Sequence, residues 1–151
     1  MSRLLPNTCS KLQFYLPLAG ALPFVAAATL SVLGVSALPW GGSVISVLMI
    51  YGLIIASFMA GVHWGQQLNL PNPIRTLLAV VSNIVALLLW GVFLSGNTPL
   101  MIIALAFTFV VLLLIDTWLS AEGVIHKHYL NIRAVVTTIV VGSLGVVGVQ
   151  L

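Results

Sequence analysis

Long apolar runs without charge, separated by short polar breaks, dominate the chain. Residues 12–74, 76–115 and 134–151 contain no Asp, Glu, Lys or Arg. Arg75 separates the first two of these runs. The first run has room for two membrane-spanning helices of about 20 residues, the second for two more, and the third for one. The pattern predicts an all-α bundle of five transmembrane helices that forms a single domain.

Turn-forming residues place the ends of these helices. Pro, Gly, Ser and Asn gather at 36–43, 66–73 and 95–99, and a hydrophilic connection covers 120–131. In the third break we expect Thr98 to be the N-cap, with a proline as the first helical residue. The predicted helices cover 14–36, 43–65, 75–94, 98–119 and 133–150.

Composition excludes several classes of protein. Hydrophobic residues make up 61 % of the 151 residues and charged residues 5 %, against roughly 25 % charged residues in soluble domains. The net charge of +3 comes from five scattered cations, which argues against nucleic-acid binding. A single Cys9 excludes a disulfide scaffold.

The cations predict the orientation of the helices. With a cytoplasmic N-terminus, Arg3, Lys11, Arg75, Lys127 and Arg133 all fall on the inner side, and the outer connections carry none. This positive-inside bias predicts an N-in, C-out protein of the bacterial cytoplasmic (inner) membrane.

A cleaved signal peptide over residues 1–37 is the competing interpretation, because Val35-Ser36-Ala37 fits the small-residue cleavage pattern. We disfavour it, since the apolar segment from Phe14 is longer than a typical signal-peptide core and contains two prolines. Those prolines, Pro17 and Pro23, predict a kinked first helix.

Four polar residues inside the apolar field form a candidate functional cluster: His63, Asn83, Asp116 and Arg133. In the predicted orientation they lie towards the inner ends of four helices. Ionisable residues within a membrane are costly and suggest function. The favoured interpretation is nevertheless structural, with an Asp116–Arg133 ion pair locking the last two helices and His63 or Asn83 completing its hydrogen bonds.

Small residues form a stripe along the second helix. Ser57, Gly61 and Gly65 recur every four residues, beside Trp64, and this spacing puts the three small residues on one face. Such stripes let another backbone approach closely, so a helix-packing motif is predicted there. His63 falls on the opposite face.

Motifs for catalysis or cofactors are missing from the sequence. No Gly-x-Ser-x-Gly elbow, phosphate-binding loop or dinucleotide fingerprint occurs. His126 and His128 with Glu122 make an incomplete metal shell, and contact with anionic lipid headgroups is the better interpretation. We therefore expect no enzyme activity, no cofactor and no metal.

Three motifs resemble a known family. They are Gly20-Ala21-Leu22-Pro23-Phe24, Tyr51-Gly52 followed by Ser57-Phe58-Met59-Ala60-Gly61-Val62-His63-Trp64-Gly65, and the spaced set Tyr129, Arg133 and Thr137. Together they resemble the membrane family called domain of unknown function three-four-two-nine, which includes mitochondrial transmembrane protein sixty-nine. Ala60 departs from the family's Gly-Gly pair, and His63 stands where some members have Arg. The resemblance implies a five-helix membrane protein without an established activity.

Two functions remain open at this point. The first is a non-enzymatic accessory or assembly component that packs against the lipid bilayer and against a membrane-protein partner or a second copy of itself. The alternative is a small transporter or proton-conducting protein that uses the polar cluster. Five helices do not divide into two equal inverted repeats, which favours the first.

Overall fold

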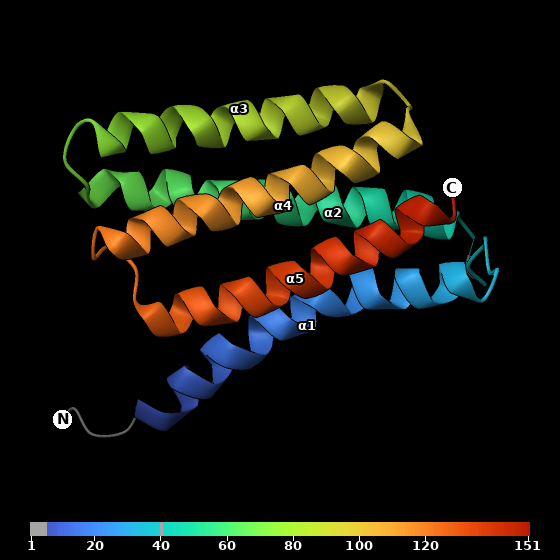
Figure 1. Ribbon diagram of the computed structural model, residues 1–151, viewed down its shortest axis with the longest axis horizontal. Coiled ribbons are helices and arrows are strands. Elements are labelled where there is room, and N and C mark those ends of the chain that lie inside the picture. Colours follow the sequence, from blue (N-terminus) through green and yellow to red (C-terminus); the bar gives the residue numbers. More distant parts are fainter. Residues whose placement is uncertain (1–5, 40) are drawn as a thin grey trace.

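The computed structural model describes residues 6–39 and 41–151, and five α-helices follow one another within them. These are α1 (Pro6–Val32), α2 (Val44–Gln66), α3 (Ile74–Leu94), α4 (Thr98–Ala121) and α5 (Lys127–Val149), with a short 3₁₀ turn, η1 (Gln67–Asn69), after α2. Each α-helix contains a segment that is long and apolar enough to cross a membrane. The predicted all-α, five-helix architecture is confirmed for the described residues (Figure 1).

The helices run along one common direction and alternate in sense. The start of α1 and the α2–α3 and α4–α5 connections lie at one end of the bundle, which we call the basic end (Figure 1). Arg75 and Lys127 lie in or beside those two connections. The α1–α2 and α3–α4 connections and the C-terminus lie at the other end. Lys11 falls in the first half of α1, and Arg3 lies outside the described residues.

The boundaries of the three middle helices agree with the prediction to within two residues. The predicted starts of the outer helices are wrong, because α1 begins at Pro6 and α5 at Lys127. The prediction assigned the residues around Lys11 and Lys127, which precede the two apolar runs, to connections instead of helices. Charged residues do not break a helix, however, and no Pro or Gly lies between Lys127 and Arg133. Pro6 suits a first helical position because its missing N–H is not needed there.

The turn between α3 and α4 ends one helix and caps the next. Gly96 adopts a positive φ of 67°, which suits glycine because it has no Cβ. Asn97 is the N-cap of α4, and its side-chain oxygen accepts a hydrogen bond from the backbone N–H of Leu100 at 2.9 Å. The prediction of Thr98 as the cap is therefore wrong by one residue.

This cap gives a local test of the turn. Asn97→Ala removes the acceptor and is expected to lower the free energy of unfolding by about 1 kcal/mol. Thr98→Ala is the matched control and should have a smaller effect, since Thr98 is the first helical residue and not the cap. Thermal unfolding of the detergent-solubilised protein measures both variants. Equal losses would contradict the assignment of Asn97.

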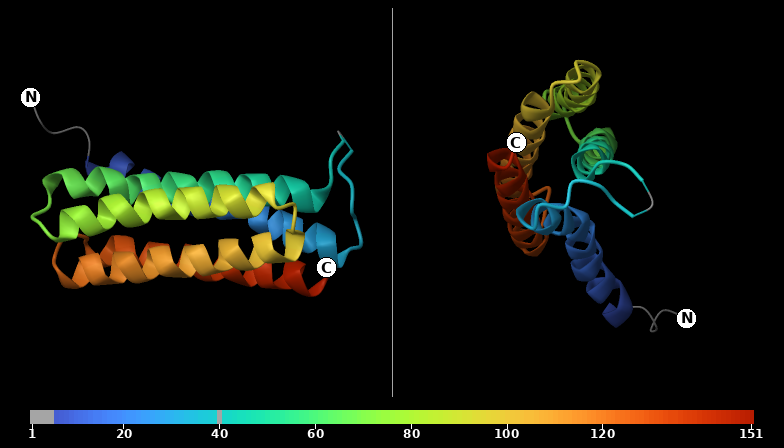
Figure 2. Two further views of the ribbon diagram at one scale, coloured as in Figure 1. Left: turned by 90° about the horizontal axis from the view of Figure 1, so that it is seen from above. Right: turned by 90° about the vertical axis from the view of Figure 1, so that its right-hand side faces the viewer.

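Helix α1 changes direction along its length, as its two internal prolines, Pro17 and Pro23, predict (Figure 1). In the end-on view of Figure 2, its first half leans away from the other helices. Its second half packs among them, where Phe24 is fully buried and its ring contacts those of Tyr51 and Phe109. The bend therefore opens space between α1 and α2 towards the basic end.

The close approach of α2 to α4 uses a different small-residue stripe from the predicted one. Gly52, Ala56 and Ala60 are buried, and a Cβ added at Gly52 would lie 2.7 Å from Cδ1 of Leu105. By contrast, a Cβ at Gly61 or Gly65 would meet nothing within 4 Å.

The predicted packing motif instead lies towards α3 without a tight contact. Ser57, Gly61 and Trp64 line a hollow that they share with Ser82, Asn83 and Ala86 of α3. Trp64 is about half exposed, and both Gly61 and Gly65 are exposed. The four-residue spacing identified a face of α2 that lies towards α3, whereas the buried contact of α2 with α4 lies on the face of Gly52. The hydrophobic residues of α2 do not differ enough around the helix to show this from sequence.

Candidate functional site

Three of the four candidate polar residues meet in the interior and form a hydrogen-bonded triad. Nε2 of His63 lies 2.8 Å from Oδ1 of Asp116, and Nε of Arg133 donates to Oδ2 of the same carboxylate at 2.8 Å. Because an ionised carboxylate only accepts, the histidine donates. The three residues are 5 % exposed or less. The triad therefore ties α2, α4 and α5 together through one carboxylate.

All three residues lie near the basic end of their helices. His63 is three residues before the end of α2, Asp116 five before the end of α4, and Arg133 six after the start of α5. At 1.5 Å per residue, these offsets correspond to depths of about 5 to 9 Å. The predicted Asp116–Arg133 pair, with His63 completing its hydrogen bonds, is present in the structure.

Asn83 does not join the triad. Its side chain is exposed on α3, and Nδ2 donates to the carbonyl oxygen of Ala79 one turn earlier, at 2.8 Å. The buried face of α3 carries Leu78, Ser82, Val85 and Leu89 instead. The predicted convergence rested on depth along the helix, whereas burial depends on the direction around it. For Asn83 the prediction of a shared cluster is therefore wrong.

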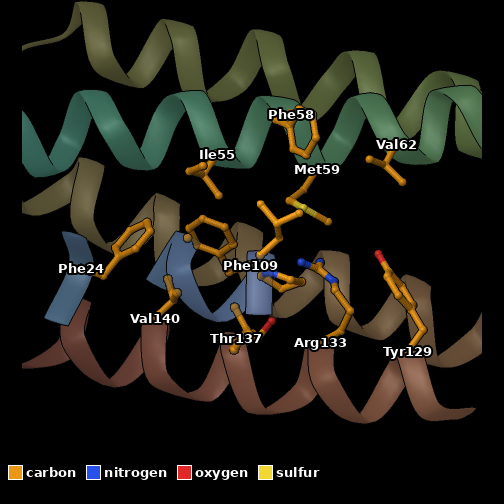
Figure 3. Close-up of a pocket in the computed structure, with 14 residues that line it drawn as sticks. Phe24, Ile55, Phe58, Met59, Val62, Phe109, Tyr129, Arg133, Thr137 and Val140 are labelled. Carbon is orange, nitrogen blue, oxygen red and sulfur yellow. The ribbon is translucent and has the colours of Figure 1, made fainter. Parts of the chain in front are cut away.

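A cavity of about 360 Å³ lies beside the triad, and we call it the lateral cleft. Helices α1 and α2 form its two sides, and α5 with Phe109 of α4 forms its base (Figure 3). The lining residues are mostly apolar: Leu16, Pro17, Gly20, Phe24, Ile55, Phe58, Met59, Val62, Phe109, Tyr129, Arg133, Val136, Thr137 and Val140. Its sides are formed by α2 and by the bent helix α1.

The polar side chains that line the cleft all come from α5. Tyr129, Arg133 and Thr137 are four residues apart, so they lie on one face of the helix, one turn above another. In Figure 3 they project from α5 towards Met59 and Val62. The same three residues form one of the motifs that resemble the family, but no role was predicted for Tyr129 or Thr137 from the sequence. Their periodicity was the signal that could have placed them together with Arg133.

Two polar atoms of these side chains are buried without a hydrogen-bond partner among the described residues. They are Nη2 of Arg133 and Oγ1 of Thr137, two residues that are 5 % and 3 % exposed. Buried polar atoms are usually paired, because an unmade hydrogen bond there costs about 1–3 kcal/mol. Nδ1 of His63 and Oε1 of Gln66 are also unpaired, but neither residue lines the lateral cleft. Nη2 of Arg133 and Oγ1 of Thr137 are shielded by their neighbours, so the surface of the cleft itself is mostly apolar.

Comparison with known families matches residues 9–149 to the model described as "Protein of unknown function (DUF3429)". The chain belongs to this family. The match covers all five helices apart from the first residues of α1, and it confirms the family resemblance of the sequence motifs. Neither a curated protein nor a solved structure matches the chain. The family description assigns no activity, so the triad and the cleft are the features that bear on function.

Proposed function

We propose that this family member is a non-enzymatic accessory component of the bacterial inner membrane, oriented N-in and C-out, that holds a lipid-class molecule in the lateral cleft. The observation that carries the proposal is an apolar cavity whose two sides are membrane helices and whose base includes the polar residues Tyr129, Arg133 and Thr137. Ligand sites commonly combine an apolar lining with a few placed polar groups.

The orientation is supported by the cations at the basic end. Arg75 and Lys127 lie at this end of the bundle together with His126 and His128, and all four are exposed. Positive residues in short loops favour the cytoplasmic side, and exposed cations there suit contact with anionic headgroups. In the proposed orientation the triad lies in the inner leaflet.

The size and lining of the lateral cleft suit a single chain as its occupant. The cleft has a volume of about 360 Å³, and most of its lining residues are apolar. An acyl or similar chain from the surrounding lipid fits this volume and needs no polar partner along most of its length.

The proposed accessory role includes association with another membrane protein or with a second copy of this chain. Large apolar side chains are exposed along α3 and α4, including Leu87, Leu88, Ile103, Phe107 and Leu114. In a bilayer such faces contact lipid or another helix, and neither contact requires polar groups.

Transport or proton conduction is the alternative that uses the same triad. We favour binding because both carboxylate oxygens of Asp116 already carry hydrogen bonds to fixed partners. Conduction would require those bonds to break and reform during each cycle. Proton flux through reconstituted wild-type protein that Asp116→Asn abolishes would support the alternative.

Lipid retention tests the proposed function. Wild-type protein, Gly20→Leu and Gly145→Leu are purified from native membrane in mild detergent, and bound lipid is quantified by mass spectrometry. A Cβ added at either glycine would meet nothing within 4 Å. Gly20 lines the cleft, however, and Gly145 does not. We expect wild type and Gly145→Leu to retain lipid and Gly20→Leu to lose most of it. Equal retention by all three would overturn the proposal.

A further inference from the structure

We infer that two copies of this chain pair through the outer face of α2 and α3, with Asn83 of one copy hydrogen-bonded to Asn83 of the other. The inference rests on the proposed accessory role, because it specifies the association with a second copy, and it is independent of what the lateral cleft holds. We call this surface the α2–α3 face. It surrounds a hollow of about 180 Å³ that is lined by Ser57, Gly61, Trp64, Ser82, Asn83 and Ala86.

The depth and exposure of Asn83 point to a partner outside the chain. Asn83 lies nine residues after the start of α3 at Ile74, which is about 14 Å into a hydrocarbon core about 30 Å thick. Its side chain is exposed. Polar side chains at this depth almost always face other protein groups, because contact with lipid alone is costly.

Most of the hydrogen-bonding capacity of this amide is unused. Nδ2 donates to the carbonyl oxygen of Ala79 at 2.8 Å, and the side chain makes no other hydrogen bond within the described residues. By contrast, the exposed Thr117 and Thr138 each donate their one hydroxyl hydrogen to a carbonyl four residues earlier. Of these three side chains, Asn83 is therefore the one that keeps a free donor.

Small residues beside Asn83 let another helix come close. Gly61 and Gly65 of α2 are exposed, and a Cβ added at either would meet nothing within 4 Å. Ser57 and Gly61 line the same hollow as Asn83, since α2 and α3 lie side by side (Figure 1). Interfaces between membrane helices are enriched in small residues with this spacing, and asparagine side chains form hydrogen bonds across them.

A second copy suits this face because the amide complements itself. An amide offers both a donor and an acceptor, so two of them can exchange two hydrogen bonds. Copies related by a two-fold axis along the membrane normal present the same residue at the same depth. Arg75 is the only charged residue in the stretch 44–94, and it lies at the second position of α3. Pairing therefore brings no like charges together within the hydrocarbon core.

Energy transfer between labelled copies tests the pairing. Full chains with a donor or an acceptor dye at the C-terminus are mixed in liposomes of phosphatidylcholine and phosphatidylglycerol at several protein-to-lipid ratios. We expect wild type to associate and Asn83→Leu to raise the dissociation constant roughly tenfold, which corresponds to about 1.4 kcal/mol for the two hydrogen bonds. Thr138→Val removes an exposed polar group of α5 and should leave the constant unchanged.

Cysteine cross-linking tests the position of the contact without relying on the Asn83→Leu variant. In a Cys9→Ser background, Asn83→Cys should form disulfide-linked dimers in the same liposomes under mild oxidation, because the two-fold axis brings the two positions together. Thr138→Cys is the control. It lies eleven residues after the start of α5, at a similar depth, and should form few such dimers.

The possible failures separate this inference from lipid binding. A lipid or a different protein as the partner of Asn83 would give no energy transfer between copies and would overturn the inference. Association that Asn83→Leu leaves unchanged, or equal cross-linking at positions 83 and 138, would also overturn it. The lipid proposal would stand in each case, since no residue of the hollow lines the lateral cleft and lipid retention is judged by Gly20→Leu.

Discussion

Asp116→Asn is expected to lower the free energy of unfolding by roughly 3–5 kcal/mol, the largest loss of any single substitution considered. The carboxylate is 1 % exposed and is bonded to His63 and Arg133. Without its charge, the guanidinium of Arg133 remains buried and uncompensated. Denaturant or thermal unfolding in detergent, followed by tryptophan fluorescence, measures the loss.

A control variant and a double-mutant cycle distinguish the coupling between Asp116 and Arg133 from the general effect of removing a charge. Glu122→Gln removes the chain's other acidic charge at an exposed position after α4 and should change stability by no more than about 0.5 kcal/mol. Arg133→Gln alone should cost as much as Asp116→Asn, because it leaves the carboxylate uncompensated. The double variant should cost less than the sum of the two, since neither charge is then left alone. Additive losses, or losses no larger than that of Glu122→Gln, would contradict a coupled buried pair.

The scarcity of charge explains why the triad could be predicted at all. Only two acidic residues occur in the chain, and Asp116 is the one within an apolar run. A buried carboxylate needs a cationic partner, and Arg133 begins the next apolar run at the same end of the bundle. The depth of these residues along their helices, their charges and the alternating direction of the helices were sufficient to predict that Asp116, Arg133 and His63 meet.

Direction around each helix was the part that the sequence did not reveal. The helices are apolar on nearly every side, so hydrophobic periodicity does not separate a lipid face from a protein face. Asn83 has the right depth but lies on the exposed side of α3, and Gly61 has the right spacing but lies on the open side of α2. In a bilayer both faces favour the same residues, which removes the signal that works in water.

The lateral cleft escaped prediction for a related reason. It results from the bend of α1, which the prolines predicted, combined with the direction in which the bent half leans, which they did not. Tyr129, Arg133 and Thr137 share a face of α5, yet the predicted start of this helix at 133 left Tyr129 in a loop. Once α5 begins at Lys127, their four-residue spacing becomes a polar stripe along a ligand cavity.

Gly52→Leu is the second substitution expected to have a large effect, at about 3 kcal/mol of lost stability. A Cβ alone would lie 2.7 Å from Cδ1 of Leu105, whose side chain is fully buried and has little room to move. The larger side chain would push α2 from α4. Because His63 and Asp116 are carried by these two helices, it should also disturb their hydrogen bond.

Gly61→Leu is the matched control, since it makes the same change on the open side of the same helix. A Cβ at Gly61 meets nothing within 4 Å, so the substitution should change the unfolding temperature little. Thermal unfolding of both variants beside wild type therefore decides which small-residue stripe of α2 carries the packing. If Gly61→Leu proved the more damaging of the two, the tighter contact of α2 would lie on the face of Ser57, Gly61 and Gly65, against α3 or against another chain in an oligomer.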